Sequence, residues 1–299
     1  MIKEFIINYM YNKMDDCYYL ESIFFQRGLL DNIADAIYIL TMENSKRQGN
    51  FMKQIYDYQL HKNIFIMKNK GFKNCDKVVC NNNDCKLIDN TESDAVNAYI
   101  NAFKHALSMK YDKIIILEDD FICSPELKNQ FHIANIEKIT RNMPNNLFSF
   151  GVLPFVTTYH SKYIRKCWIS SGAHATLIPK YFFDKFIKNE YNICEMDFYL
   201  NMNGNKYIYY KPLVLQTFPI TDNFKNWGNN CSGKLFGHIF RFFMRCIIKT
   251  LNLDNRAEPG TSIMYVLNAL VYDLVVPLII LKIILKKIYP NIYQKYLKF

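Results

Sequence analysis

An apolar run that ends in three acids constrains the fold of this chain more than any other segment. Residues 113–117 read Lys-Ile-Ile-Ile-Leu and lead directly into Glu118, Asp119 and Asp120. A continuous apolar run of this length is typical of a strand buried on both faces, as in a parallel sheet. Because side chains two apart on a strand share a face, we expect Glu118 and Asp120 to point one way and Asp119 the other.

Acidic side chains that gather where a buried strand ends repel one another unless a cation neutralises them. Two oxygen ligands on one face of a sheet edge suit a divalent cation that also holds phosphates. The alternative is a solvated acidic turn after a core strand. Three acids are too short a motif to decide between these interpretations by themselves.

The order of the expected elements favours the ligand site. In the first 120 residues, strand-like runs at 35–41, 63–67 and 77–79 alternate with helical patterns at 48–58 and 91–111. Such alternation implies a parallel sheet with right-handed crossovers, which binds ligands at the carboxyl ends of its strands. Later elements are expected as strands at 147–151, within 168–179 and at 206–215, and helices at 181–188 and from about 195. The predicted class is α/β, with a mostly parallel sheet flanked by helices.

Composition and charge divide the chain into three parts. Of its 299 residues, 50% are hydrophobic and 21% charged, which indicates a globular chain rather than a disordered one. We expect a helical segment at 1–34, the α/β domain at 35–230 and a helical appendage at 231–299. Residues 234–299 hold ten lysines and arginines against three acids, which is +7 of the net +10. Because the basic character belongs to the appendage, a nucleic-acid-binding core is not expected.

The nine cysteines are an odd number, and the first ten residues are too polar and short for the apolar region of a signal peptide. We therefore expect mostly reduced cysteines and a cytosolic main domain. Cys75, Cys80 and Cys85 stand five apart, whereas zinc ligands usually pair two to four apart. A loop with free thiols is the favoured interpretation of this segment.

Five segments in the chain form an ordered set: Ile37–Arg47, Ile116–Phe121, Gly172–Pro179, Glu195–Asp197, and Pro212–Gln216 with Thr221–Asn223 downstream. In this order they resemble glycosyltransferase family 25, the group of lipooligosaccharide and collagen galactosyltransferase-like enzymes. The second segment, Ile-Leu-Glu-Asp-Asp-Phe, is nearly the most recognisable motif of that family. The resemblance covers roughly residues 35–225.

The resemblance implies a GT-A fold, a nucleotide-sugar donor, most often a UDP-sugar, and a Mn²⁺ or Mg²⁺ cofactor. Glu118 and Asp120 match the positions expected to hold metal and donor, with Asp120 in direct contact with the metal. Asn44 and Arg47 match the loop expected near the nucleotide, and Asp119 is assigned to the same donor site.

The acceptor half follows from the same resemblance. Asp197, or Glu195, would be the general base that activates an acceptor hydroxyl, with inversion at the anomeric centre. Gly172, His174 and Trp168 are assigned to the acceptor site.

Ordinary structural roles compete with several of these assignments. Asp197 and Glu195 would also suit the first turn of a helix, where the dipole favours acids. His174 would also suit a buried, hydrogen-bonded position, and Trp168 would suit core packing. Trp227 would either close over the site or mark the end of the domain.

The chain departs from the family pattern in the helix before the acidic motif. That helix usually carries Ser-His about twenty residues upstream of the motif. By spacing, Asn97 and Ala98 stand there, and His105 is offset. If the family histidine handles the donor, this chain uses a different sugar or none.

The appendage holds two segments that predict membrane contact. Basic residues recur every three or four positions in 234–251, as on one face of an interfacial helix. The alternative is packing of this helix on the domain. Residues 263–285 are long enough to span a bilayer, but Asp273 and Pro277 near the middle are costly or kink-prone in lipid. We expect a peripheral or monotopic segment at the cytoplasmic face, with a transmembrane helix as the second choice.

Together these features predict a membrane-associated hexosyltransferase that moves a sugar to a glycan or lipid-linked acceptor. The alternative is a catalytically degenerate GT-A domain that serves as a membrane-bound scaffold.

Overall fold

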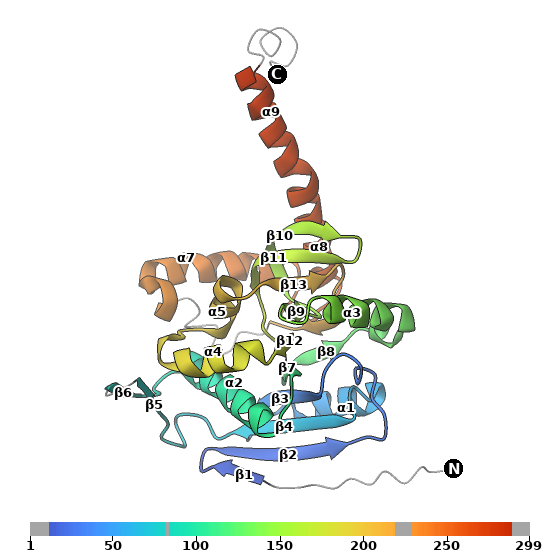
Figure 1. Cartoon of the computed structure of the whole chain (residues 1–299). Helices are drawn as coiled ribbons and strands as arrows, with labels where there is room; N and C mark the ends of the chain where they lie inside the picture. Colours follow the sequence, from blue (N-terminus) through green and yellow to red (C-terminus); the bar gives the residue numbers. More distant parts are fainter. Residues whose placement is uncertain (1–11, 82–83, 219–228, 289–299) are drawn as a thin grey trace.

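The computed structural model describes residues 12–81, 84–218 and 229–288, and Figure 1 shows their arrangement. Within these residues, a mixed sheet of ten strands forms the centre of the molecule, and helices cover both of its faces. The predicted α/β class is therefore confirmed. Two features singled out in the sequence, Trp227 and Thr221–Asn223, lie outside the described residues.

The strands of the central sheet lie in the spatial order β1-β2-β4-β3-β7-β12-β9-β13-β11-β10. In chain order they are β1 (Asn12–Asp15), β2 (Tyr18–Phe24), β3 (Ala36–Met42), β4 (Asn63–Asn69), β7 (Lys113–Glu118), β9 (Leu147–Ser149), β10 (Leu153–Ser161), β11 (Ile164–Ser171), β12 (Ala175–Pro179) and β13 (Lys206–Tyr209). Two short pairs lie apart from it, β5 (Val78–Asn81) with β6 (Asp84–Leu87), and β8 (Phe121–Cys123) with β14 (Val214–Gln216).

The helices are α1 (Gln48–Tyr58), α2 (Thr91–Ser108), η1 (Pro125–Lys128), α3 (Gln130–Asn142), α4 (Tyr181–Asn189), η2 (Glu190–Asn192), α5 (Met196–Asn203), α7 (Asn229–Thr250), α8 (Gly260–Leu270), η3 (Val271–Val275) and α9 (Val276–Ile288). Most of the helices expected from the sequence are present, with ends close to the expected ones. The N-cap of α2 is Asn90, whose side chain accepts a hydrogen bond from the Ser93 amide.

The sheet is parallel around β3, where β3 pairs in parallel with both β4 and β7, and Leu40 lies opposite Glu118 at the carboxyl end of β7. The expected strand at 77–79 does not join this sheet, because β5 pairs antiparallel with β6 in a separate pair. Beyond β7 the prediction of a mostly parallel sheet is wrong, because β12 runs antiparallel to both β7 and β9, and β11 runs antiparallel to both β10 and β13. β13, which follows α4 and α5, is parallel to β9. A hairpin joins β10 to β11, and short connections join β9 to β10 and β11 to β12, which reverses the chain direction.

Alternation along β7 explains why helices cover both faces of the sheet. Ile114 and Ile116 belong to the core packed by α2, α4 and α5, whereas Ile115 and Leu117 belong to the core packed by α1 and α3. All four side chains are almost completely buried. The continuous apolar run is therefore a strand with two dry faces, as predicted.

The N-terminal segment is strand rather than helix. β1 pairs with β2, and β2 pairs antiparallel with β4 along its whole length. Tyr18, Leu20 and Ile23 of β2 are buried in the core. The prediction of a helical segment at 1–34 is wrong for residues 12–24, because these β-branched and aromatic residues extend the sheet.

The prediction of mostly reduced cysteines is also wrong. Disulfides join Cys17 to Cys75 and Cys80 to Cys85, and Cys194 is disulfide-bonded as well. The described free thiols are those of Cys123, Cys167 and Cys246. The Cys17–Cys75 disulfide could not be predicted from the sequence, because the pairing of β2 with β4 is what brings these two distant residues together.

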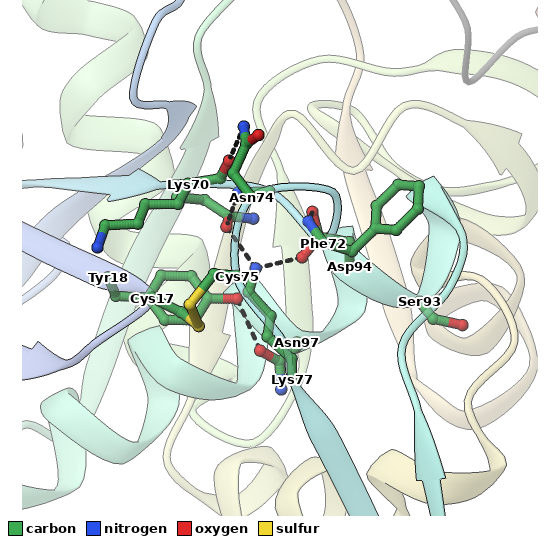
Figure 2. Close-up of polar contacts among 12 residues, drawn as sticks. Cys17, Tyr18, Lys70, Phe72, Asn74, Cys75, Lys77, Ser93, Asp94 and Asn97 are labelled. Carbon is green, nitrogen blue, oxygen red and sulfur yellow. Dashed lines mark hydrogen bonds and ion pairs between the residues drawn. A yellow bond between two sulfur atoms is a disulfide. The ribbon is translucent and has the colours of Figure 1, made fainter.

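The Cys17–Cys75 disulfide borders a buried polar cluster, shown in Figure 2. The Lys77 ammonium group donates to the side chains of Asn69 and Asp94, and it lies 4.6 Å from the centre of the Tyr18 ring. An ion pair and a cation–π contact thus hold the loop after β4 against α2.

The appendage packs on the domain before it leaves it. Met244 and Ile248 of α7 are buried with Leu153 of β10 and Phe218. This side of α7 therefore packs on the domain, which was the alternative to an interfacial helix. Phe242 on its other side is exposed. The helix formed by α8, η3 and α9 includes Gly260–Ile284, which is long and apolar enough to cross a membrane, and α9 projects away from the domain in Figure 1.

Candidate functional site

The acidic triplet stands where β7 ends, and its side chains divide as predicted. Glu118 and Asp120 face the same partner, Gln216 of β14. The Gln216 Nε2 donates to Asp120 Oδ1 at 2.9 Å and lies 3.5 Å from Glu118 Oε2. Asp119 turns the other way and accepts a hydrogen bond from Thr41 Oγ1 at 2.8 Å.

Asp119 organises the loop that follows β3. It accepts hydrogen bonds from Ser45 Oγ at 2.6 Å and from Arg47 Nη1 at 2.9 Å. The same Arg47 nitrogen lies 3.3 Å from Asp120 Oδ2, so one guanidinium group serves two carboxylates. Asn44 is exposed in this loop. The loop therefore places the Arg47 guanidinium group beside the acids, and the hydrogen bonds of Asp119 hold the loop in this position.

Glu118 and Asp120 carry negative charge that is only partly compensated. Burial, together with the charges of Asp120 and Asp197, raises the pKa of Glu118 to about 8. Burial raises the pKa of Asp120 to about 6, although Arg47 acts in the opposite direction. The Asp120 side chain keeps 12% of its surface exposed, so a ligand can reach it from solvent. Tyr99 of α2 donates its hydroxyl to Glu118 Oε1 at 2.9 Å.

Asp197, in the first turn of α5, lies on the same side of the sheet end. Its Oδ2 accepts hydrogen bonds from the Gly172 amide at 2.7 Å and from Ser171 Oγ at 3.3 Å. Gly172 has φ +93°, and a Cβ there would stand 2.6 Å from His174 Nδ1. Only glycine therefore lets the chain turn here and present its amide to Asp197.

His174 is buried beside Gln216. Neither of its ring nitrogens has a hydrogen-bond partner among the described side chains and backbone, and the same holds for Gln216 Oε1. Burial lowers the pKa of His174 to about 4, so the ring is neutral. A Cβ on Gly172 would lie within 3.4 Å of both His174 Nδ1 and Gln216 Oε1, which places these two atoms close together. His174 therefore stands behind the carboxylates instead of lining an open acceptor site.

The sequence predictions did not include Gln216 or Tyr99 as site residues. Gln216 ends the family-like segment Pro212–Gln216 but was given no role, although a polar residue at a strand's carboxyl end was a usable signal. Tyr99 was not singled out, because its hydroxyl meets Glu118 only through the packing of α2 on the sheet.

Two predicted residues lie apart from the cluster described above. Trp168 is half exposed on β11, and its Nε1 donates to Thr158 of the neighbouring strand at 3.1 Å. Glu195 precedes α5 as its N-cap residue. The assignments of Trp168 to the acceptor and of Glu195 to catalysis stay predictions.

The departure from the family pattern has a structural explanation. The Asn97 Oδ1 accepts a hydrogen bond from the Tyr18 hydroxyl at 2.7 Å, in the cluster of Figure 2. His105 Nδ1 pairs with the Tyr38 hydroxyl at 2.6 Å, and its ring packs on Phe65. Both residues support the core of the parallel half.

Glu118 and Asp120 are the two carboxylates that could hold a metal ion at this site. In the part of the chain that the structure describes, no group of three or more His, Cys, Asp or Glu side chains is placed to hold a metal ion. Glu118 and Asp120 offer two carboxylates. Mg²⁺-type sites commonly use one or two carboxylates and complete their shell with substrate phosphates and water.

No protein-family model matches the chain, and no curated protein matches it. Among solved structures, the chain is similar to the one described as "Crystal Structure of A197 from STIV", at 12% sequence identity and a TM-score of 0.39. The match covers 62% of this chain and 86% of that one. A likeness of this size does not define a fold family.

Proposed function

We propose that the chain is a glycosyltransferase with a GT-A-like domain of the family 25 type. It would move a sugar from a nucleotide donor, most often a UDP-sugar, to a hydroxyl of a glycan or lipid-linked acceptor. The observation that carries the proposal is the meeting of Glu118 and Asp120 with a third carboxylate, Asp197, which comes from about eighty residues further along the chain.

The first pair of carboxylates suits the donor. Glu118 and Asp120 would hold Mn²⁺ or Mg²⁺, and the cation would neutralise charge on the departing diphosphate. Their raised pKa values fit this role, because a buried acid pair with one shared arginine is short of positive charge. Arg47 sits beside the pair on the loop after β3, where it can contact a phosphate oxygen.

Asp197 suits the acceptor. In the transfer, the bond from the anomeric carbon to the diphosphate oxygen breaks as a bond to the acceptor oxygen forms, and the acceptor proton must go to a base. The hydrogen bonds from Gly172 and Ser171 both fall on Oδ2, which orients the carboxylate and leaves Oδ1 to take that proton. One base and direct displacement correspond to inversion.

The proposal is tested by a donor screen on the purified full chain. We expect release of free sugar from one nucleotide sugar in the presence of Mn²⁺ and loss of that release on addition of EDTA. In parallel, calorimetry should show that the matching nucleoside diphosphate binds only with the metal. Absence of nucleotide binding for every diphosphate tried, with the chain folded, would reject the proposal. Metal-dependent binding without turnover on any acceptor would favour the degenerate scaffold instead.

A further inference from the structure

In the long helix that begins at Gly260, polar side chains contact the sheet domain, and most of the apolar side chains are exposed. On its first turns the polar side chains face the domain. The Tyr265 hydroxyl accepts a hydrogen bond from the Val152 amide at 3.2 Å, and Asn268 pairs with the Thr157 hydroxyl of β10. Tyr265 and Asn268 are both buried by these contacts.

Asp273, the charge that made a bilayer location costly in the sequence, is also neutralised by the domain. Its carboxylate pairs with both terminal nitrogens of Arg165 on β11, one of them at 2.8 Å. The Arg165 Nε donates to Thr157 at 2.8 Å, so the guanidinium group is held in place. The charge that would be expensive in lipid is therefore matched by an arginine of the sheet domain.

The remaining surface of this helix is apolar and uncovered. The outer side of α8 exposes Val266 and Leu270. On α9, the four consecutive residues Leu278–Leu281 are each 50–55% exposed. Because consecutive residues point in directions about 100° apart, α9 is apolar on every side.

A protein partner with a groove covers one side of a helix, whereas lipid covers all of them. The helix Gly260–Ile284 has 25 residues and is roughly 37 Å long, but Tyr265, Asn268 and Asp273 in its first part contact the domain. Residues 274–284, beyond these contacts, measure roughly 16 Å, about half of a hydrocarbon core of about 30 Å. Lys282 and Lys287 are exposed near the far end, where basic side chains can reach headgroups.

We propose that the far part of this helix, residues 274–284, is embedded in a lipid bilayer and that the sheet domain is docked at the membrane surface on the preceding turns, through Tyr265, Asn268 and Asp273. The domain is then held against the membrane surface in one orientation, with no flexible tether between them. This inference does not depend on the proposed enzymatic activity.

The first arm of the test is flotation of the full chain with phosphatidylcholine vesicles, followed by an alkaline carbonate wash. The wild-type chain should float and resist the wash. A variant with Leu278→Asp and Leu281→Asp should lose at least about tenfold of the floated fraction. The matched control is Val78→Asp with Leu87→Asp on β5 and β6, two residues that are 58% and 55% exposed and lie far from α9 in Figure 1; it should float like wild type.

A wild-type chain that is washed off, or that stays soluble and monomeric without lipid or detergent, would overturn the proposal. So would a discrete dimer in lipid-free buffer that the two α9 substitutions dissociate, since a second copy would then cover the helix.

The second arm tests the docking. Asp273→Ala should leave flotation unchanged but speed amide hydrogen exchange in β10 and β11 of the vesicle-bound chain at least severalfold. Unchanged exchange in these strands would contradict the docked arrangement, because a tethered domain would not sense the substitution.

Discussion

Two regions of this molecule hold carboxylates beside an arginine, and they neutralise the negative charge to different extents. Asp273 meets both terminal nitrogens of Arg165, and the pair is complete within the chain. Glu118 and Asp120 share the amide of Gln216, and Asp120 shares Arg47 with Asp119. A charge that the fold neutralises fixes an element in place, whereas a charge that it leaves short of partners is available to a ligand.

The largest effect should come from the pair that is short of positive charge. Asp120→Ala should lower metal-dependent donor hydrolysis about 10³-fold, because the diphosphate loses its neutralising site. Initial rates with the donor found in the screen measure this. The control is Asp112→Asn, which changes an exposed acid just before β7, at the end opposite the site, and should leave the rate unchanged. Equal rates for Asp120→Ala and wild type would show that Asp120 does not take part in donor hydrolysis.

The third carboxylate should separate transfer from donor binding. Asp197→Asn keeps an oxygen for the Gly172 amide but removes the base, so we expect transfer to the acceptor to fall about 10²-fold. Affinity for the nucleoside diphosphate with Mn²⁺, measured by calorimetry, should stay within about twofold. A parallel loss of affinity would assign Asp197 to the donor side.

The Arg165–Asp273 ion pair should affect the stability of the fold and leave catalysis unchanged. Asp273→Ala leaves the largely buried Arg165 without its partner and should cost about 2–3 kcal/mol of unfolding free energy. Chemical denaturation in detergent measures the change. Asp112→Ala, which breaks the exposed Lys180–Asp112 pair, is the control and should cost under about 1 kcal/mol. Similar losses for the two variants would remove the contrast between a docking pair and a surface pair.

A smaller effect of opposite sign is expected at Glu118. Its pKa is about 8 in the folded chain and 4.5 in the reference state, so the folded state holds the proton more tightly. The free energy of unfolding must then fall as pH rises from about 4.5 to about 8. Glu118→Gln removes this dependence and should raise Tm by roughly 3 °C at pH 8, with no change near pH 4. Scanning calorimetry in metal-free buffer would detect it, and a lower Tm at pH 8 would contradict the assignment.

Much of the parallel half was predictable because its signals are local. The apolar run before Glu118 and the helical pattern that begins at residue 91 each depend on neighbours within a few residues. The division of Asp119 from its neighbours followed from strand periodicity alone, and the structure confirms it. The convergence of Asp197 on Glu118 came only from resemblance, since nothing in the local sequence records a contact across about eighty residues.

The errors of prediction share one cause, which is dependence on distant partners. β2 is a strand because β4 offers it an edge, and Cys17 is oxidised because that pairing brings Cys75 beside it. Asp273 looked like an obstacle to lipid because its arginine stands more than a hundred residues away.

The π-helical turn η3 has a consequence for the direction of α9. In this turn the Val276 amide bonds back to the Val271 carbonyl, five positions earlier, so the turn holds one residue more than an α-helical one. Deleting a single residue from it would restore the regular repeat and turn everything beyond by about 100°. If Tyr272 is the residue deleted, Asp273 rotates away from Arg165 while every valine and leucine of the turn is kept. Chain length at this one turn, more than composition, therefore sets the tilt at which the domain would meet a membrane.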